Sequence, residues 1–174
     1  MRNAIVGFGL FCLILVIWWR PWKNSGDGGP ATSSTANPQA VLDSRLALAA
    51  TFQTEGERRL EAREFEKAVT ALQEAYRIRR ELLGRWNTNT YATLEKLADA
   101  TYSMRESAAI KSPGEVLTNA LQLTLELRAA VTNVFHGEEA KEKLIEIQAQ
   151  LVSLYRNLGL NADADAEERA SYMA

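Results

Sequence analysis

An all-α fold is predicted by three features of the sequence. Through most of residues 38–174, large apolar side chains recur three or four positions apart, which is the spacing of one face of a helix. Helix start and stop signals bound these stretches, such as Asn37 followed by Pro38, and the glycines Gly84 and Gly159. No stretch alternates apolar and polar residues over several β-branched positions, so no β-strand is expected.

The first element is an unbroken apolar run at residues 4–19, AIVGFGLFCLILVIWW. As a helix these residues reach roughly 24 Å at ~1.5 Å per residue, which is short of the ~30 Å hydrocarbon core of a bilayer. Aromatic and long basic side chains at the end of the run suit the interface between lipid and water, and they can extend the span. These membrane-interface residues are Trp18, Trp19, Arg20, Trp22 and Lys23. Residues 1–23 are therefore predicted to form a transmembrane anchor.

The apolar run is expected to be retained as an anchor. The alternatives are a signal peptide that is cleaved and a helix buried in the folded domain. Bulky residues follow the run directly, and the nearest patch of small residues begins only near Ala31. Gly7, Phe8, Gly9 and Phe11 could pack against a membrane helix of another subunit, although a plain lipid-facing helix is the alternative.

Orientation in the membrane is weakly specified. The positive charges on the two sides of the run are balanced, so the positive-inside rule gives little guidance. The very short N-terminal tail favours a cytoplasmic N-terminus. We therefore expect a single-pass protein of a bacterial inner membrane, with a lean towards a periplasmic domain.

Composition separates a linker from a folded domain. Residues 24–37, NSGDGGPATSSTAN, contain no large apolar side chain and predict a flexible linker. Residues 38–174 are long enough to bury a core as one domain. The formal net charge of the chain is −2, and every acidic residue follows the anchor, which argues against a general nucleic-acid surface. The single cysteine, Cys12, lies in the apolar run, so no disulfide framework is expected.

Three helices are predicted in the first half of the domain. The first begins at Asn37 and Pro38, a capping residue followed by one that the first helical turn tolerates. The second covers residues 64–83 and ends at Gly84, as a left-handed cap would end it. The third starts near Thr90, where leucines and alanines continue the helical spacing.

Three more helices are predicted in the second half. The fourth begins at Pro113, where Ser112 and Glu115 match the pattern of a capping box. The fifth covers residues 138–158 and has two glutamates in its first turn, which suit the positive end of the helix dipole. The sixth is short and polar and runs to about residue 172.

Two parts of the domain are alike at an offset of 49 residues. The tripeptide Ala-Leu-Gln at residues 71–73 recurs at residues 120–122, and the same interval separates Asn87 from His136. Helix pairs that repeat in this way stack side by side, because each pair covers the apolar face of its neighbour.

The second predicted helix resembles the second helix of a tetratricopeptide repeat (TPR). The residues that carry the resemblance are Phe65, Glu66, Lys67, Ala68, Ala71, Leu72, Ala75, Ile78, Leu82, Leu83 and Gly84. The continuation through Asn87 is similar to the long repeat of kinesin light chains and many bacterial proteins, but the proline usual in its loop is missing and Arg63 replaces a usual glycine. The resemblance implies a stack of about three antiparallel helix hairpins with a concave surface that binds a peptide or protein.

Catalytic and metal sites are not expected. His136 is the only histidine, and the repeat places it in a loop between helices as a structural residue. The sequence offers no paired nucleophile and base, no paired catalytic carboxylates and no set of converging metal ligands. We therefore predict no enzyme activity, no cofactor and no metal.

The densest group of basic and aromatic side chains is the strongest candidate for a binding surface. It consists of Arg77, Arg79, Arg80, Arg85 and Trp86. Arginine pairs with an aromatic neighbour could bind an acidic peptide or lipid head groups. The alternative is a solvated helix face on which Glu74 and Glu81 pair with the arginines.

These features predict a membrane-anchored scaffold that binds other protein subunits. Within that class, an accessory or assembly subunit of a larger membrane complex is favoured, with energy-transducing complexes among the candidates. A periplasmic chaperone-like binder of exposed polypeptide segments is the alternative.

Overall fold

Six helices account for nearly all of the residues that the structure describes. The computed structural model describes residues 37–107 and 112–171. All described residues belong to one unit of the chain, Ala36–Ala174. The helices are α1 (Pro38–Glu61), α2 (Phe65–Leu83), α3 (Thr88–Met104), α4 (Pro113–Val134), α5 (Gly137–Asn157) and α6 (Asn161–Ser171). The described part contains no strand, which confirms the predicted all-α class.

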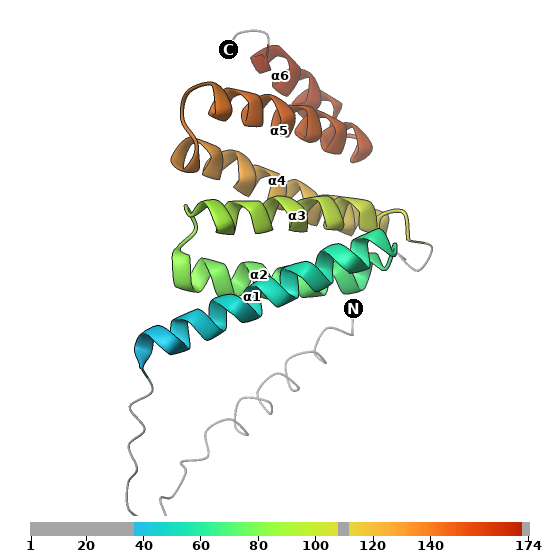
Figure 1. The fold of residues 1–174 in the computed structure, drawn as a ribbon. Helices are drawn as coiled ribbons and strands as arrows, with labels where there is room; N and C mark the ends of the chain where they lie inside the picture. Colours follow the sequence, from blue (N-terminus) through green and yellow to red (C-terminus); the bar gives the residue numbers. More distant parts are fainter. Residues whose placement is uncertain (1–36, 108–111, 172–174) are drawn as a thin grey trace, which may run out of the picture. The chain divides into compact units, whose positions relative to one another are not determined.

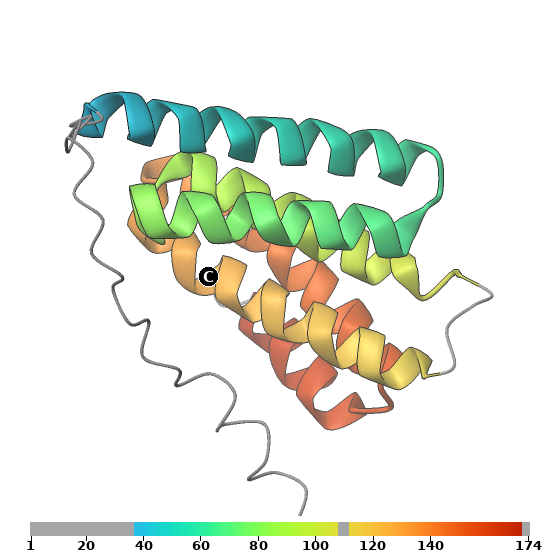
Figure 2. The ribbon, with the colours of Figure 1, turned by 90° about the horizontal axis from the view of Figure 1, so that it is seen from below.

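The helices form a stack in chain order. Each helix packs against the next one in the chain, and α1 also contacts α3 (Figure 1). Short connections reverse the chain between most neighbours, so consecutive helices run antiparallel. The view at right angles shows α1 and α2 covering one side of α3, with α4, α5 and α6 continuing on its other side (Figure 2).

Helix starts repeat along the stack. Phe65 and Pro113, which begin α2 and α4, are 48 residues apart, and Thr88 and Gly137, which begin α3 and α5, are 49 apart. Asn87 and His136, related by the same 49-residue offset, both occupy the N-cap position of their helices, so His136 does lie in a loop. The offset read from the sequence therefore relates equivalent helices.

Asparagine caps two helices as the residue preferences predict. The Asn37 side chain accepts a hydrogen bond from the backbone N–H of Gln39 at 3.1 Å, next to Pro38 in the first turn. Asn87 accepts from the backbone N–H of Asn89 at 2.9 Å, so α3 begins two residues before the predicted Thr90.

Two predicted helix ends differ in detail. α4 begins at Pro113 as predicted, but the Ser112 side chain makes no capping hydrogen bond, so the capping box with Glu115 is wrong. Gly84 ends α2 with φ 83° and ψ 165°, not with the ψ of a left-handed cap. That extended conformation at positive φ is essentially restricted to glycine.

Arg63 takes a left-handed conformation in the turn between α1 and α2. Its φ is 58°, and its backbone N–H donates to the carbonyl of Leu60 at 3.0 Å. The next N–H, of Glu64, donates to the carbonyl of Arg59 at 2.9 Å and completes the turn. A residue with a Cβ is strained here, at the position where the resemblance implies glycine.

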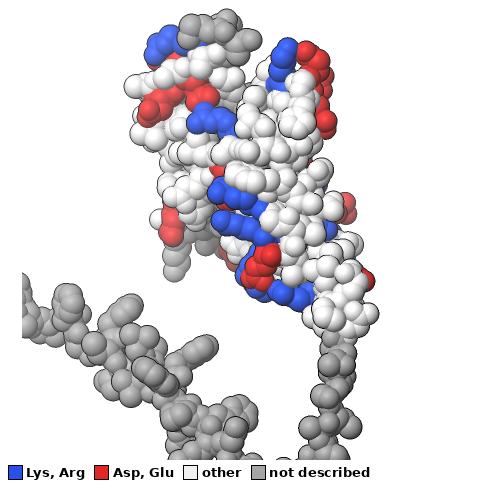
Figure 3. Space-filling view, turned by 90° about the vertical axis from the view of Figure 1, so that its left-hand side faces the viewer, with Lys and Arg blue, Asp and Glu red and all other residues white. Residues whose placement is uncertain are grey.

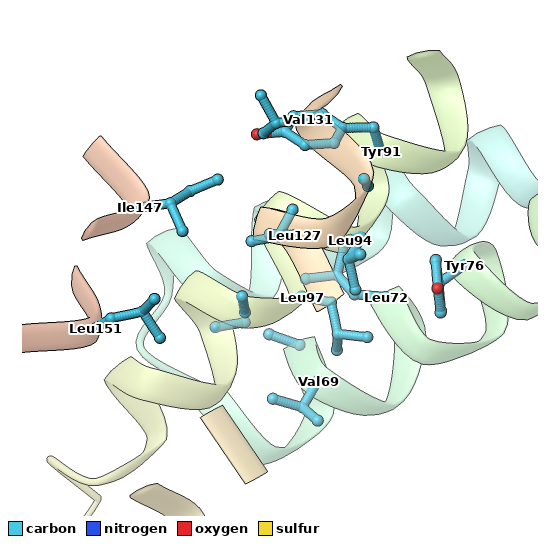
Figure 4. Packing of buried hydrophobic residues seen from close by; sticks show 14 residues of the cluster. Val69, Leu72, Tyr76, Tyr91, Leu94, Leu97, Leu127, Val131, Ile147 and Leu151 are labelled. Carbon is cyan, nitrogen blue, oxygen red and sulfur yellow. The ribbon is translucent and has the colours of Figure 1, made fainter. Parts of the chain in front are cut away.

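One continuous core joins four helices. Its buried side chains come from α2, α3, α4 and α5, and Figure 4 shows them meeting between the helices. Leu72, Leu127 and Leu151 are among the largest side chains that are fully buried. Tyr91 meets Phe135 edge to face, with ring centroids 4.8 Å apart.

Gly56 allows α1 to lie close to α2. A Cβ built at Gly56 would lie 2.6 Å from Cγ of Leu72 and 3.3 Å from the carbonyl oxygen of Ala68. Both neighbours are fully buried core residues. The absence of a side chain at residue 56 therefore sets how closely the two helices pack.

The last helix, α6, buries one of its described side chains and makes polar contacts with α4 and α5. Ala164 is its fully buried residue. The Arg128 guanidinium of α4 donates to both carboxylate oxygens of Glu167, at 2.9 and 3.0 Å, and Gln148 of α5 donates to the Glu167 carbonyl at 3.0 Å. These polar contacts tie α6 to α4 and α5.

Candidate functional site

The predicted group of arginines does not form one surface. Residues two positions apart on a helix point in different directions, and α2 carries Arg77 and Arg79 at that spacing. For Arg77 the predicted alternative, a solvated helix face paired with Glu74 and Glu81, is confirmed. Its guanidinium donates to Glu74 at 2.8 Å and to Glu81 at 2.9 Å. Glu81 also accepts from Arg45 of α1 at 2.6 Å. Arg77 is thus held within a surface network of ion pairs.

Arg79 joins three helices. Its guanidinium donates to the side chains of Gln53 on α1 and Thr93 on α3. Burial lowers the pKa of the Arg79 guanidinium. Because its donors bind the chain's own side chains, Arg79 serves the packing of α2 between its neighbours rather than an outer surface.

Arg80, Arg85 and Trp86 do lie together, around a carboxylate that the sequence had not singled out. Oε1 of Glu126 on α4 lies 3.9 Å from the Arg80 guanidinium and 3.7 Å from that of Arg85. The Tyr76 hydroxyl donates to the same oxygen at 2.7 Å. The Arg85 guanidinium stacks on Trp86, 4.2 Å from its ring centroid.

This Arg80–Arg85–Trp86 cluster has the chemistry of an anion site that already holds an anion. Burial, followed by the hydrogen bond to Glu126, raises the pKa of the Tyr76 hydroxyl to about 12. Two guanidinium groups against one carboxylate leave one positive charge, but an incoming acidic group has to compete with Glu126. Figure 3 shows basic and acidic side chains interspersed on the side of the stack where α2 meets α3.

A second candidate is a pocket between α3 and α5. Its volume is about 300 Å³, which is at the lower limit for a small-molecule site and suits a single side chain. α3 contributes Ala98, Asp99 and Tyr102, and α5 contributes Ala149, Gln150 and Ser153. Thr124 of α4 and Leu154 lie at the same pocket. We call this the α3–α5 pocket.

Side chains fix the two walls of the α3–α5 pocket relative to each other. Glu95 accepts a hydrogen bond from the Lys143 ammonium at 2.9 Å at one end. At the other end the hydroxyls of Tyr102 and Ser153 lie 3.2 Å apart and share a hydrogen bond. The pairs show that α3 and α5 run in the same direction, with the pocket between them.

Asp99 is the unusual group in the α3–α5 pocket. It is half-buried, and within residues 37–107 and 112–171 it makes no hydrogen bond or ion pair. Burial, reinforced by the negative charge of Glu95, raises the pKa of the Asp99 carboxyl against the opposing effects of Lys96 and Lys143. Gln150 likewise has no hydrogen-bond partner within the described residues. The pocket therefore presents an unpaired acceptor and an amide to an incoming group.

The described residues contain no candidate metal site. No three or more His, Cys, Asp or Glu side chains gather there closely enough to hold an ion. His136 is exposed at the start of α5. The described side chains thus include candidate binding surfaces but no grouped metal ligands.

The predicted membrane residues lie outside the described part of the chain. They are the interface residues Trp18, Trp19, Arg20, Trp22 and Lys23, and the helix-packing residues Gly7, Phe8, Gly9 and Phe11. Among the helices between residues 37 and 171 that the structure describes, none has the length and apolar character of a membrane span. The anchor at residues 4–19 stays a prediction.

Comparison of the chain with models of protein families, with curated proteins and with solved structures gave no match. The TPR resemblance accordingly stays a prediction.

Proposed function

We propose that this chain is a membrane-anchored, TPR-like scaffold that binds another protein, as an accessory or assembly subunit of a larger membrane complex. Energy-transducing complexes belong to this class. The observation that carries the proposal is the α3–α5 pocket. This pocket opens between two helices of the stack, and unpaired polar side chains line it. A surface of this kind suits an extended segment or a helix of a partner.

The anchor and the linker support the membrane part of the proposal. An apolar run at residues 4–19 followed by a linker of residues 24–37 keeps the helical stack close to the bilayer, since a mobile linker of that length spans roughly 20 Å. The partner is then a protein in the same membrane or at its surface. The proposed location is a bacterial inner membrane with the helical stack on the periplasmic side.

A second candidate is a chaperone-like binder of exposed polypeptide segments. Exposed apolar side chains on α5 favour it, because Ile145 is 66 % exposed and borders a hollow that also includes Val152. Such a surface could accept many sequences. Neither candidate gives the chain a catalytic role.

Purification in a mild detergent distinguishes the two. The tagged full-length chain is compared with a fragment of Ala36–Ala174, which keeps the Asn37 cap of α1, and copurifying proteins are quantified by mass spectrometry. A fixed-ratio membrane complex that only the full-length chain retains supports the anchored subunit. Varied proteins at low ratios with both forms favour the chaperone-like binder and contradict the subunit.

A further inference from the structure

The α3–α5 pocket holds a carboxylate without a counter-ion. We propose that it receives a lysine or arginine side chain of a partner protein, and that Asp99 is the counter-ion. The inference rests on the proposed function, since it takes the partner to be a protein. Beyond the proposed function, it specifies that the group inserted by the partner is positively charged.

Asp99 differs from the carboxylates near it. Glu95 is paired with Lys143 at 2.9 Å, and Glu146 lies 3.6 Å from the same ammonium. Asp99 has no such partner within the described residues, although burial makes its charged form unfavourable. A partially desolvated charge gains most from a partner that brings the opposite charge and hydrogen bonds. A basic side chain therefore relieves a cost that the unbound chain carries.

The positive groups around Asp99 leave room for another cation. Lys96 on its own helix and Lys143 on α5 are the cations whose charge reaches it. The Lys143 ammonium is bound between Glu95 and Glu146. α4 faces the pocket with Thr124, whose hydroxyl donates to the backbone carbonyl of Ala120 at 2.8 Å. No element that forms the pocket supplies a cation to Asp99 within salt-bridge distance, as far as the structure describes them.

The walls of the α3–α5 pocket match the two parts of a long basic side chain. Ala98 and Ala149 are small, and Leu154 is apolar, so an aliphatic stem can lie between the helices. Gln150 offers an amide oxygen beside the carboxylate, and a guanidinium has donors for both. The Tyr102 ring already carries a cation of the chain itself, because the Arg105 guanidinium lies 3.6 Å from its centroid. An acidic group in the same place would be repelled by Asp99.

The surface next to the α3–α5 pocket fits the rest of a partner segment. Ala149 lines both the pocket and the adjoining hollow on α5 that includes Ile145 and Val152. A segment with a basic residue flanked by apolar ones could therefore place its charge at Asp99 and its apolar side chains along α5. Such charge complementarity selects against acidic segments.

Binding of a defined peptide tests the inference without the natural partner. The probe is the capped peptide Ala-Leu-Ser-Arg-Ala-Leu-Ser, with matched peptides that carry lysine, glutamine or glutamate in place of arginine. Each is titrated into the ¹⁵N-labelled full-length chain in detergent micelles, and backbone amide shifts are followed by NMR. We expect saturable shifts at residues 98–102 and 149–153 with the arginine and lysine peptides, and none with the glutamate peptide.

Charge-matched variants assign the effect to Asp99. Asp99→Asn is expected to weaken binding of the arginine peptide at least about tenfold. Glu139→Gln removes the same charge from an exposed site in the first turn of α5 and should leave binding unchanged. The amide spectrum of each variant away from the substituted residue reports whether it folds as the native chain does.

Three results would overturn the inference. They are the absence of saturable shifts with both basic peptides, equal binding by the glutamine peptide, and equal binding by the Asp99→Asn chain. Failure of the proposed function is seen separately, as the absence of a copurifying membrane complex with the native chain. If that complex is present and Asp99→Asn retains it fully, the scaffold stands and the role of Asp99 in it falls.

Discussion

At the scale of single residues, Arg63 shows a local cost that the chain tolerates. Its left-handed φ of 58° brings Cβ into conflict with the backbone, at roughly 1–2 kcal/mol, while glycine has no such conflict. The Arg63 side chain is exposed and makes no hydrogen bond or ion pair within the described residues.

Arg63→Gly is therefore expected to raise the free energy of unfolding by about 0.5–1 kcal/mol, after the entropy that glycine adds to the unfolded chain is deducted. Urea unfolding of the Ala36–Ala174 unit measures it. Ala62→Gly is the matched control, since Ala62 has an ordinary φ of −76° and should lose stability. A loss of stability in Arg63→Gly as well would contradict the explanation by backbone strain.

Asp99 gives a prediction about pH, because its pKa is raised in the folded chain. Below the pKa of the unfolded state both states bind the proton, and the contribution of Asp99 to stability is fully present. As pH rises through the folded pKa the proton is lost and that contribution disappears. Asp99 thus lowers stability at neutral pH.

Asp99→Asn cannot ionise, so at pH 7 it is expected to unfold at a higher urea concentration than the native sequence. The difference should shrink as pH falls below the usual range of aspartate. Urea midpoints of the Ala36–Ala174 unit at pH 3 and pH 7 measure this difference. Glu139→Gln is the control, because it removes the charge of an exposed carboxylate. A lower midpoint for Asp99→Asn at pH 7 would mean that Asp99 stabilises the fold.

At the scale of elements, the close approach of α1 and α2 depends on Gly56. Alanine there would gain helix propensity of about 1 kcal/mol, but its Cβ would lie 2.6 Å from Cγ of Leu72. Overpacking of a buried contact typically costs about 1–3 kcal/mol. Packing outweighs propensity, because Leu72 is fully buried in the core and any shift of its side chain disturbs its neighbours.

Gly56→Ala is accordingly expected to destabilise the Ala36–Ala174 unit by about 1–2 kcal/mol. Gly114→Ala, in the first turn of α4 with nothing within 4 Å of the new Cβ, should be neutral or stabilising. In the background of Leu72→Ala, the cost of Gly56→Ala should shrink, because the clashing atoms are gone. Equal costs in both backgrounds would rule out Leu72 as the cause.

The sequence predicted the elements better than the contacts between them. Pro38, Pro113 and Gly159 mark helix ends through local backbone preferences, which need no knowledge of the fold. The side-chain hydroxyl of Ser112 did not form its expected cap, because a pattern match does not fix a rotamer. Gly56 carried no signal, since its role exists only when α2 lies beside it.

The candidate sites show the same division. Reading Arg77, Arg79 and Arg80 as one surface ignored that Arg79 points away from the other two around α2, although the helical period was known. Glu126 and Asp99 could not be found from neighbours in the sequence. Each acquires its role from a helix that is distant in the chain, α2 for Glu126 and α5 for Asp99.

At the scale of the whole molecule, the continuous core rather than the surface ion pairs holds the stack together. Pairs such as Arg45–Glu81 and Arg156–Glu168 are largely exposed, and exposed pairs contribute ~0–1 kcal/mol each. Leu127, in contrast, is 2 % exposed in the centre of the core (Figure 4).

Leu127→Ala is expected to lower the free energy of unfolding by about 2–5 kcal/mol, through lost burial and the cavity that remains. Val41→Ala, at a residue that is 46 % exposed, should change it by less than about 0.5 kcal/mol. Urea unfolding of the native sequence at 0.1 M and 1 M sodium chloride measures how much stability is lost when salt screens the ion pairs, and this loss is compared with that of the two variants. A salt effect larger than that of Leu127→Ala would show that ion pairs dominate.

The order of the helices along the stack has a consequence for synthesis of the chain. Backbone contacts join each helix mainly to its predecessor, so each hairpin can fold as it leaves the ribosome, before the remainder is made. The α3–α5 pocket is an exception, because one wall ends at Tyr102 and the other begins at Ala149. A nascent chain therefore has its first three helices before the second wall of this pocket is made, and the ligand proposed to bind at Asp99 has to wait until α5 has been synthesised.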